Sequence, residues 1–280
     1  MKMKQLTAGM IALVMSMSLP MTTYAADWYL EDGSITVDAG DSGQTVTQGS
    51  KPAVPDEAPV ITQRDSSAET GNTITINASE ENATANVTIS NVNINTSGAA
   101  VSTGGKGNVN IELDGTNTLK SGDWHAGLEK NNDGNLTITD KNENGKLSAT
   151  GGYEGAGIGG GVYAGGNDII ITGGQVTAAG GDYGAGIGGG YLGDSNNITI
   201  TGGEVTAIGG TNGAGIGGGL RKNGEKITVS GDAMLKVQGG QTDAWDGAGA
   251  GIGNGGSLNE DLFIPVNGAE TEPDTSNLTT

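Results

Sequence analysis

The chain has 280 residues, with 13 basic and 32 acidic side chains, a formal net charge of −19, and no cysteine. This charge argues against nucleic acid or anionic lipid as a partner, because their phosphates require Lys and Arg, and a disulfide framework is excluded. The 54 glycines follow no every-third-residue rule and only 6 prolines are present, which excludes a collagen helix.

Residues 1–25 are typical of a secretory signal peptide. Lys2 and Lys4 precede an apolar run from Leu6 to Leu19. The segment ends with small residues at Thr23 and Ala25, which suit cleavage after Ala25. The run is shorter than the roughly 20 residues of a membrane span, although an N-terminal membrane anchor is the alternative interpretation. We expect an extracellular protein, released or associated with the cell surface, with no membrane insertion after cleavage.

Residues 26–66 are predicted to form an N-terminal cap. Strand-like pieces at 35–37, 46–47 and 60–61 are broken by three prolines. A cap would cover the first coil of a repeat domain, whose open strand edge otherwise invites aggregation. The repeat domain is expected at 67–265, and an acidic, flexible tail at 266–280.

A seven-residue string, Gly-Ala-Gly-Ile-Gly-Gly-Gly, begins at Gly155, Gly184 and Gly213, and therefore recurs with an exact 29-residue period. Self-similarity at a fixed period of this length indicates a solenoid whose units bury their apolar faces against each other. Earlier coils are looser, with related segments at 87–89, 109–111 and 136–138, at shorter and unequal intervals. The last unit carries an insertion around 241–249.

One unit, 196–223, contains three short segments separated by glycine pairs. Residues 198–201 and 204–207 alternate apolar and polar side chains, and Ala214 and Ile216 share one parity. The sequence therefore predicts an all-β, right-handed parallel β-helix with three sides and seven or eight coils, stacked about 4.8 Å apart. Parity places these residues in inward columns: Ile169, Ile198 and Ile227; Ile171, Ile200 and Val229; Val176 and Val205; Ala178 and Ala207; Ala156, Ala185 and Ala214; Ile158, Ile187 and Ile216.

Three motifs together resemble a family of secreted β-helix proteins of Gram-positive gut bacteria. They are Asn-Val-Asn-Ile-Glu-Leu-Asp-Gly-Thr-Asn-Thr-Leu-Lys at 108–120, Leu-Thr-Ile-Thr at 136–139, and the Gly-Ala-Gly-Ile-Gly-Gly-Gly units. Members are commonly described as carbohydrate-binding-domain proteins with a pectate-lyase-like superfold, and one branch is a calcium-loaded β-helix that binds pectic polysaccharide. The resemblance covers roughly 30–265 and implies the architecture and a polysaccharide ligand. Since its motifs are core and corner residues, it assigns no ligand or calcium residue.

Catalytic residues are hard to place in this chain. A pectate-lyase-type site needs an Arg beside calcium-held carboxylates, and the two arginines, Arg64 and Arg221, lie apart from such clusters. Aspartates do not recur in a column, as polygalacturonase-type hydrolysis would require. His125 is the only histidine and has no nucleophile motif near it. We therefore predict that the protein is not an enzyme.

Four carboxylates precede the Ala-Gly-Ile segment in different units and are candidate ligands for a shared hard cation: Asp123, Glu154, Asp182 and Asp246. Carboxylate oxygens on adjacent coils suit Ca²⁺. The alternative is that these are solvated loop carboxylates, since the unit between Asp182 and Asp246 offers Asn212 instead.

Four aromatic residues run beside these acids and are the candidate ligand-binding residues: Trp124, Tyr153, Tyr183 and Trp245. Stacked coils would place them along one edge, where aromatic faces suit sugar rings and carboxylates accept hydroxyl hydrogens. Tyr163 and Tyr191 follow the glycine run and could extend this surface, one column out of register. The alternative is that the rings only cover loop backbone.

The predicted function is non-catalytic binding of an extracellular polysaccharide. The alternatives are a structural or adhesive stalk without a glycan ligand and, third, an enzyme of pectate-lyase type.

Overall fold

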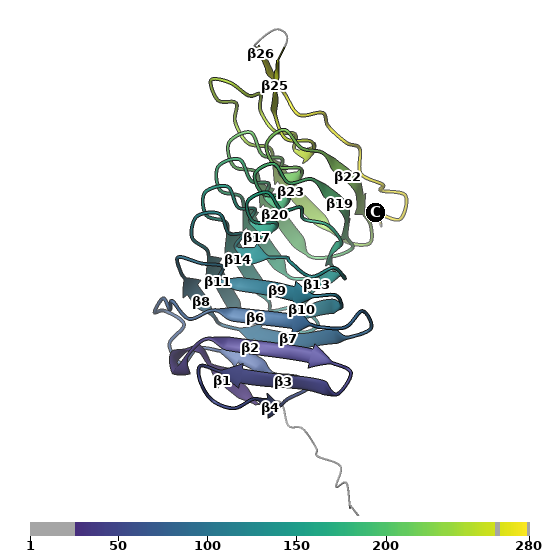
Figure 1. The fold of residues 1–280 in the computed structure, drawn as a ribbon. Helices are drawn as coiled ribbons and strands as arrows, with labels where there is room; N and C mark the ends of the chain where they lie inside the picture. The colour runs from purple at the N-terminus through teal and green to yellow at the C-terminus, as the bar shows by residue number, and fades with distance from the viewer. Residues whose placement is uncertain (1–25, 261–263, 279–280) are drawn as a thin grey trace, which may run out of the picture.

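The computed structural model of the chain describes residues 26–260 and 264–278, so the signal peptide expected at 1–25 lies outside the described residues. The described chain is a tall stack of about seven coils, with the N-terminal strands at one end and the C-terminal hairpin at the other (Figure 1). Its only helical element is the single 3₁₀ turn η1 (Leu30–Asp32), and within the described part no helix could cross a membrane.

Three long sheets form the sides of the described stack. Sheet 1 contains, in spatial order, β1 (Asp27–Tyr29), β5 (Val60–Thr62), β7 (Thr84–Ser90), β10 (Asn108–Asp114), β13 (Leu136–Thr139), β16 (Ile169–Ile171), β19 (Ser195–Ile200) and β22 (Gly224–Val229). Sheet 2 contains β8 (Asn93–Asn95), β11 (Thr116–Lys120), β14 (Lys146–Thr150), β17 (Gln175–Ala179), β20 (Glu204–Ile208) and β23 (Met234–Gln238).

Sheet 3 carries the repeated glycine motif. It contains β4 (Val54–Pro55), β3 (Gly43–Gln48), β2 (Ile35–Gly40), β6 (Ile74–Ala78), β9 (Val101–Gly105), β12 (Leu128–Glu129), β15 (Ile158–Gly159), β18 (Ile187–Gly188), β21 (Ile216–Gly217) and β24 (Ile252–Gly253). A separate antiparallel hairpin consists of β25 (Ser257–Asn259) and β26 (Ile264–Val266).

The 29-residue period is the register of the parallel ladders. Ile169 pairs with Ile198, which pairs with Ile227, and their side chains are at most 2% exposed. Outward neighbours such as Thr199 keep partial exposure, because successive side chains of a strand point to opposite faces. The predicted parallel, three-sided β-solenoid is therefore confirmed, and the interior consists of stacked aliphatic columns.

The strands of sheet 3 in the repeats are only two residues long, and their coils pack backbone against backbone. Ala156, Ala185 and Ala214 are fully buried just before these strands. Gly188 ends one strand with φ +136°, and a Cβ there would lie 2.0 Å from the carbonyl oxygen of Gly217. Only glycine fits this left-handed position under a neighbouring coil, which explains why the motif recurs.

The early coils differ from the predicted spacing. Val87 pairs with Ile111, two residues beyond the expected partner Val109. The two alignments bury the same face, so hydrophobic parity alone cannot choose between them. The step from Val109 to Leu136 agrees with the prediction, and the last step, from Ile216 to Ile252, carries the expected insertion.

The two ends are built from the segments outside the regular repeats. Within 26–66, β1, β5 and β2 join their sheets in parallel, whereas β3 and β4 continue sheet 3 in antiparallel fashion and cover its first edge. At the other end, the segment predicted to be a flexible tail is hydrogen-bonded along the last coil. The Asp274 N–H donates to Ile227 O (3.0 Å), and its own oxygen accepts from the Val229 N–H (2.9 Å).

Candidate functional site

Two loops flank each short strand of sheet 3 and carry most of the aromatic side chains. We call the loop before the Ala-Gly-Ile segment the entry loop and the loop after the glycine run the exit loop. The sheet register places four entry-loop residues at equivalent positions, each with a left-handed backbone (φ 61–71°): Trp124, Glu154, Tyr183 and Asn212. The equivalent exit-loop residues, with φ 54–59°, are Tyr163, Leu192 and Arg221.

This conformation ties neighbouring coils together. The Glu154 carbonyl accepts a hydrogen bond from the Tyr191 N–H of the next coil (2.8 Å), and the Tyr183 carbonyl accepts one from the Leu220 N–H (2.9 Å). Each entry loop is thereby fixed to the following exit loop. A left-handed conformation costs a non-glycine residue about 1–2 kcal/mol, yet a chain with 54 glycines keeps large side chains at these positions.

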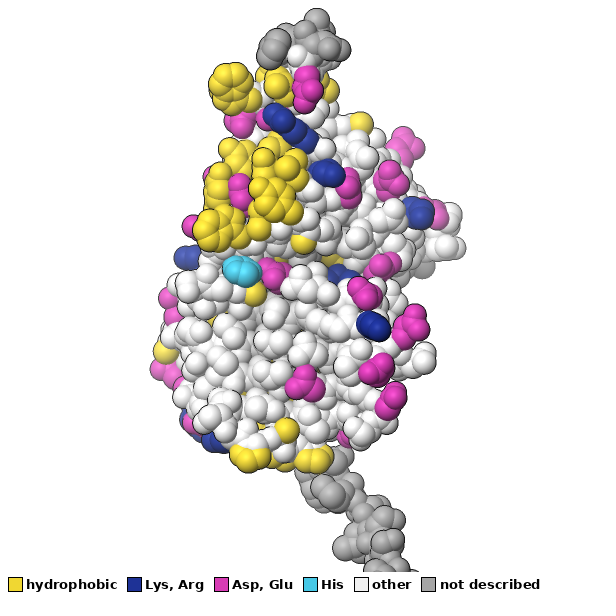
Figure 2. Space-filling model, viewed as in Figure 1, with side chains coloured by type: hydrophobic (Ala, Val, Ile, Leu, Met, Phe, Trp, Pro, Cys, Tyr) yellow, Lys and Arg dark blue, Asp and Glu magenta, His cyan; other side chains and the backbone are white. Residues whose placement is uncertain are grey.

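Four tyrosine rings from both loops form one continuous cluster, which we call the tyrosine patch: Tyr153, Tyr163, Tyr183 and Tyr191. Tyr153 meets Tyr183 edge to face at 5.8 Å between ring centroids, and Tyr191 lies 5.6 Å from both Tyr183 and Tyr163. Figure 2 shows a continuous hydrophobic area with acidic side chains beside it on this face. Tyr163 and Tyr191, expected one column out of register, belong to the cluster because the exit loop is bonded against the entry loop.

The insertion 241–249 forms a further wall beside the patch. Asn212 is fully buried and donates through Nδ2 to the carbonyl oxygens of Asp246 (3.0 Å) and Gly247 (2.8 Å). Arg221 forms two hydrogen bonds to the Asp246 carboxylate, at 2.7 and 3.1 Å. This anchoring leaves the side chain of Trp245 68% exposed at the edge of the loop.

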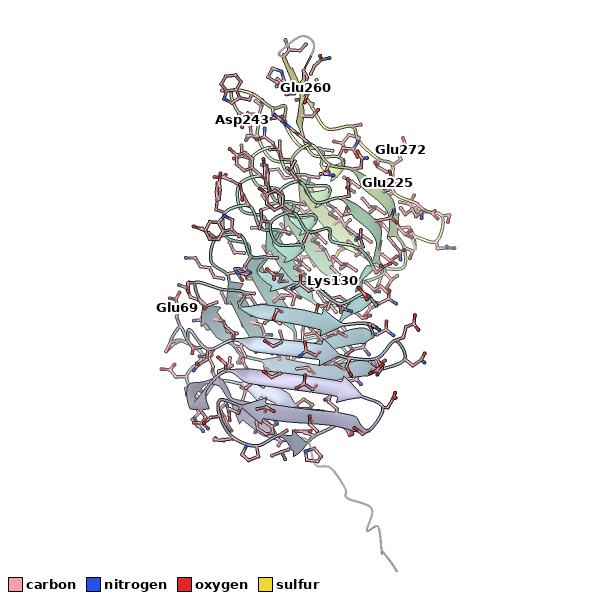
Figure 3. All side chains as sticks on the ribbon, viewed as in Figure 1. Glu69, Lys130, Glu225, Asp243, Glu260 and Glu272 are labelled. Atoms are coloured by element: carbon pink, nitrogen blue, oxygen red, sulfur yellow. The ribbon has the colours of Figure 1, made fainter. Side chains whose placement is uncertain are left out.

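A cavity of about 310 Å³ lies between the patch and the insertion. It is lined by Tyr153, Glu154, Tyr183, Tyr191, Leu220, Arg221, Asp243, Trp245 and Asp246. Asp243, labelled in Figure 3, lies at the C-terminal end of the ring cluster, on the same side of the solenoid. The cavity volume is at the lower end of the range of about 300–1,000 Å³ for ligand sites, and suits a small unit such as a sugar ring.

The structure brings together three of the four predicted aromatic residues. Tyr153, Tyr183 and Trp245 line the cavity, whereas Trp124 lies one coil away and is not among its lining residues. Trp124 is 57% exposed, and its backbone N–H donates to the Tyr153 carbonyl (2.6 Å). The predicted row alternates between two adjacent columns, since Tyr153 lies one position before the column of Trp124 and Tyr183.

The four predicted metal-binding carboxylates do not form one cluster, although two of them, Glu154 and Asp246, line the same cavity. The Asp246 carboxylate is paired with Arg221, Asp182 accepts from the Thr211 hydroxyl (2.8 Å), and Asp123 is exposed one coil away. Within residues 26–260 and 264–278, no group of three or more His, Cys, Asp or Glu side chains could hold a metal ion. Glu154 lines the cavity, and no hydrogen bond or ion pair from the described residues engages its carboxylate.

Two groups of the site have displaced pKa values. Burial raises the pKa of the Tyr183 phenol, and the neighbouring Tyr153, Asp243 and Asp182 raise it further. The hydrogen bonds that the Arg221 guanidinium donates to the Asp246 carboxylate raise the pKa of Arg221. Both groups therefore keep their protons at neutral pH: Tyr183 is a neutral hydroxyl and Arg221 a cation already paired with Asp246.

His125 has a structural partner. Its Nδ1 lies 2.8 Å from Glu129 Oε2, and the same oxygen accepts from the Ala126 N–H (3.1 Å). Glu129 pairs in sheet 3 with Gly159, so this network replaces the glycine corner of the later coils. The adjacent Lys130 is buried and donates to the Asn132 carbonyl (2.6 Å), and burial lowers its pKa. The sequence analysis did not predict this network. Its signal in the sequence is Glu129-Lys130, which stand where the next coil has Gly159-Gly160.

The left-handed backbone at Glu154 leads to a prediction about stability that does not depend on any ligand. Glu154→Gly should give a higher free energy of unfolding than Glu154→Ala, by about 0.5–1 kcal/mol. The reason is that Gly relieves the strain of φ 68°, against a smaller cost from its freedom in the unfolded chain. Thermal or urea unfolding of the two variants measures the difference. An alanine variant as stable as the glycine variant would show that the position is unstrained.

No family model, curated protein or solved structure matches this chain.

Proposed function

We propose that the protein binds an extracellular polysaccharide without catalysis, through the tyrosine patch and the cavity beside it. The observation that supports this most is the ring cluster itself. Four tyrosines from two adjacent coils contact one another in a chain of rings, next to the exposed Trp245 and to Glu154, whose carboxylate has no hydrogen-bond partner among the described residues. The C–H faces of sugar rings pack on aromatic faces, while hydroxyls donate to carboxylates.

The direction of the patch suits an extended ligand. Tyr153, Tyr183 and the insertion follow one another along the solenoid axis, because each belongs to a later coil than the one before. The rings are carried by a rigid stack whose loops are hydrogen-bonded from coil to coil. A site built in this way needs little ordering on binding, which favours affinity at low entropic cost.

Binding without turnover is supported by the chemistry of the side chains. Arg221, the cation of the cavity, is held by Asp246 rather than placed as a base, and His125 is bonded to Glu129 and is not among the residues that line the cavity. An extracellular location rests on the sequence of residues 1–25, and polysaccharide as the ligand class agrees with the resemblance described for the sequence.

Single alanine substitutions in the patch should weaken binding and leave the fold intact. We expect Tyr153→Ala, Tyr183→Ala and Trp245→Ala each to reduce affinity about five-fold, since loss of one aromatic stacking contact costs roughly 1 kcal/mol. A glycan array with and without calcium would find the ligand, and calorimetry would measure each variant. The control is Tyr29→Ala at the opposite end, where the ring lies 4.2 Å from the Arg64 guanidinium.

The two alternatives have distinct outcomes in the same experiment. If a variant that combines Tyr153→Ala, Tyr183→Ala and Trp245→Ala bound the glycan as tightly as the unchanged protein, the glycan would bind elsewhere and this site would be refuted. No binding to any glycan would favour the structural or adhesive stalk, and release of shortened products would favour an enzyme.

A further inference from the structure

The cavity beside the tyrosine patch has an unbalanced charge. Its lining includes three carboxylates, from Glu154, Asp243 and Asp246, and one cation, Arg221. The Arg221–Asp246 pair neutralises itself through two hydrogen bonds, with Asp246 only 4% exposed. Glu154 and Asp243 therefore give the lining of the cavity a formal negative charge that no cation in the lining balances.

Glu154 is the carboxylate that is best placed to meet a ligand. Among the described residues no hydrogen bond or ion pair is assigned to its side chain, although it lines the cavity next to Tyr153, Tyr183 and Tyr191. Asp243 is partly used, because one of its oxygens accepts from the Trp245 and Asp246 backbone N–H groups, both at 2.7 Å. A positively charged group would satisfy the Glu154 carboxylate at little cost to the existing network.

The surrounding rings favour the same ligand charge. A cation over a tyrosine or tryptophan face is attracted by the negative face of the ring, and the attraction grows when the cation is partly desolvated. Tyr183 stays protonated because its pKa is raised, so its phenol adds no negative charge to the cavity. Aromatic faces beside the carboxylates of Glu154 and Asp243 suit an ammonium group attached to a ring-shaped, hydroxylated body.

We infer that the cavity recognises an amino sugar with a free, protonated amine, so that the bound polysaccharide contains unacetylated amino-sugar units. The inference rests on the proposed polysaccharide-binding function and names its ligand class. The ammonium lies against Glu154 and Asp243, and the sugar ring packs on the tyrosine patch. Acidic sugars are disfavoured, because the cavity and the whole chain, with a net charge of −19, repel carboxylates and sulfates.

The test compares oligosaccharides that share one backbone and differ in charge. The purified chain is titrated by calorimetry with a glucosamine oligomer, its fully N-acetylated counterpart, a neutral glucose oligomer of the same length, and a uronic acid oligomer. We expect the free amine to bind about tenfold more tightly than the acetylated form, and the uronic acid oligomer to bind least. The preference should shrink at high salt concentration, where charge attraction is screened beyond a few ångströms.

Glu154→Gln removes the charge at nearly constant shape and should lower the preference to about threefold or less. The matched control is Asp123→Asn, which removes an exposed carboxylate one coil away and should leave the preference unchanged. Equal binding of amine, acetylated and neutral oligomers would overturn this inference and leave the proposed function standing. Binding of none of the four oligomers would also overturn this inference, whereas the proposed function would fall only if no glycan on the array bound. A lysine tetramer that binds as tightly as the amino sugar would also overturn this inference, since charge alone would then suffice.

Discussion

Ile200→Asp is expected to lower the free energy of unfolding by more than about 4 kcal/mol, which corresponds to a fall of roughly 10 °C in melting temperature. Ile200 is fully buried and pairs with Ile171 in the coil before it and with Val229 in the coil after it. An aspartate there places an unpaired charge between two aliphatic columns, where no buried partner offers a hydrogen bond. Thermal unfolding followed by circular dichroism measures the loss.

The control for this change lies one residue away. Thr199 faces outward between Ile170 and Thr228, so Thr199→Asp should change stability by no more than about 0.5–1 kcal/mol. The two variants carry the same new charge on the same strand, and only the face of the sheet differs. If both melted at the same temperature, the assignment of inward and outward parity in sheet 1 would be refuted.

The sequence was most informative where the repeat was exact. The 29-residue step predicted the pairing of Ile169, Ile198 and Ile227, because parallel coils of equal length bring identical positions into register. It was less informative in the early coils. There the coils differ in length, and a shift of two residues keeps the same face buried. Hydrophobic parity therefore could not distinguish the pairing of Val87 with Ile111 from a pairing with Val109.

The candidate site could be predicted only in part, and the reason is related. Aromatic and acidic residues near the Ala-Gly-Ile segment were visible, but their columns depend on the step from Leu128 to Ile158, which is one residue longer than the period. The contact of Tyr191 with Tyr183 depends on hydrogen bonds between entry and exit loops, and the Arg221–Asp246 pair depends on the course of the insertion. Neither follows from periodicity, because loop conformation is set by tertiary contacts.

The glycines before the entry loops support the second large prediction, that Gly210→Ala lowers the free energy of unfolding by about 3 kcal/mol or more. A Cβ at Gly210 would lie 1.7 Å from the carbonyl oxygen of Gly181, and one at Gly181 would lie 1.8 Å from that of Gly152. The obstacle is backbone and cannot rotate away, so the coils must separate. That separation would break the hydrogen bond from the Gly210 N–H to Gly184 O (3.0 Å).

The matched control is Gly71→Ala, at a position where an added Cβ meets no atom within 4 Å and the backbone is not left-handed. This change should be neutral or stabilise the fold by up to about 1 kcal/mol, because alanine has less freedom than glycine in the unfolded chain. Chemical unfolding of the two variants compares the same added methyl group in a stacked coil and in an open one.

Because Gly181 lies two residues before Tyr183, Gly181→Ala should also separate Tyr183 from Tyr153 and weaken glycan binding, whereas Gly71→Ala should not. If Gly210→Ala and Gly71→Ala were equally stable, the coils would not be packed backbone against backbone. The rigid coil spacing that holds the rings of the tyrosine patch in contact would then be refuted as well.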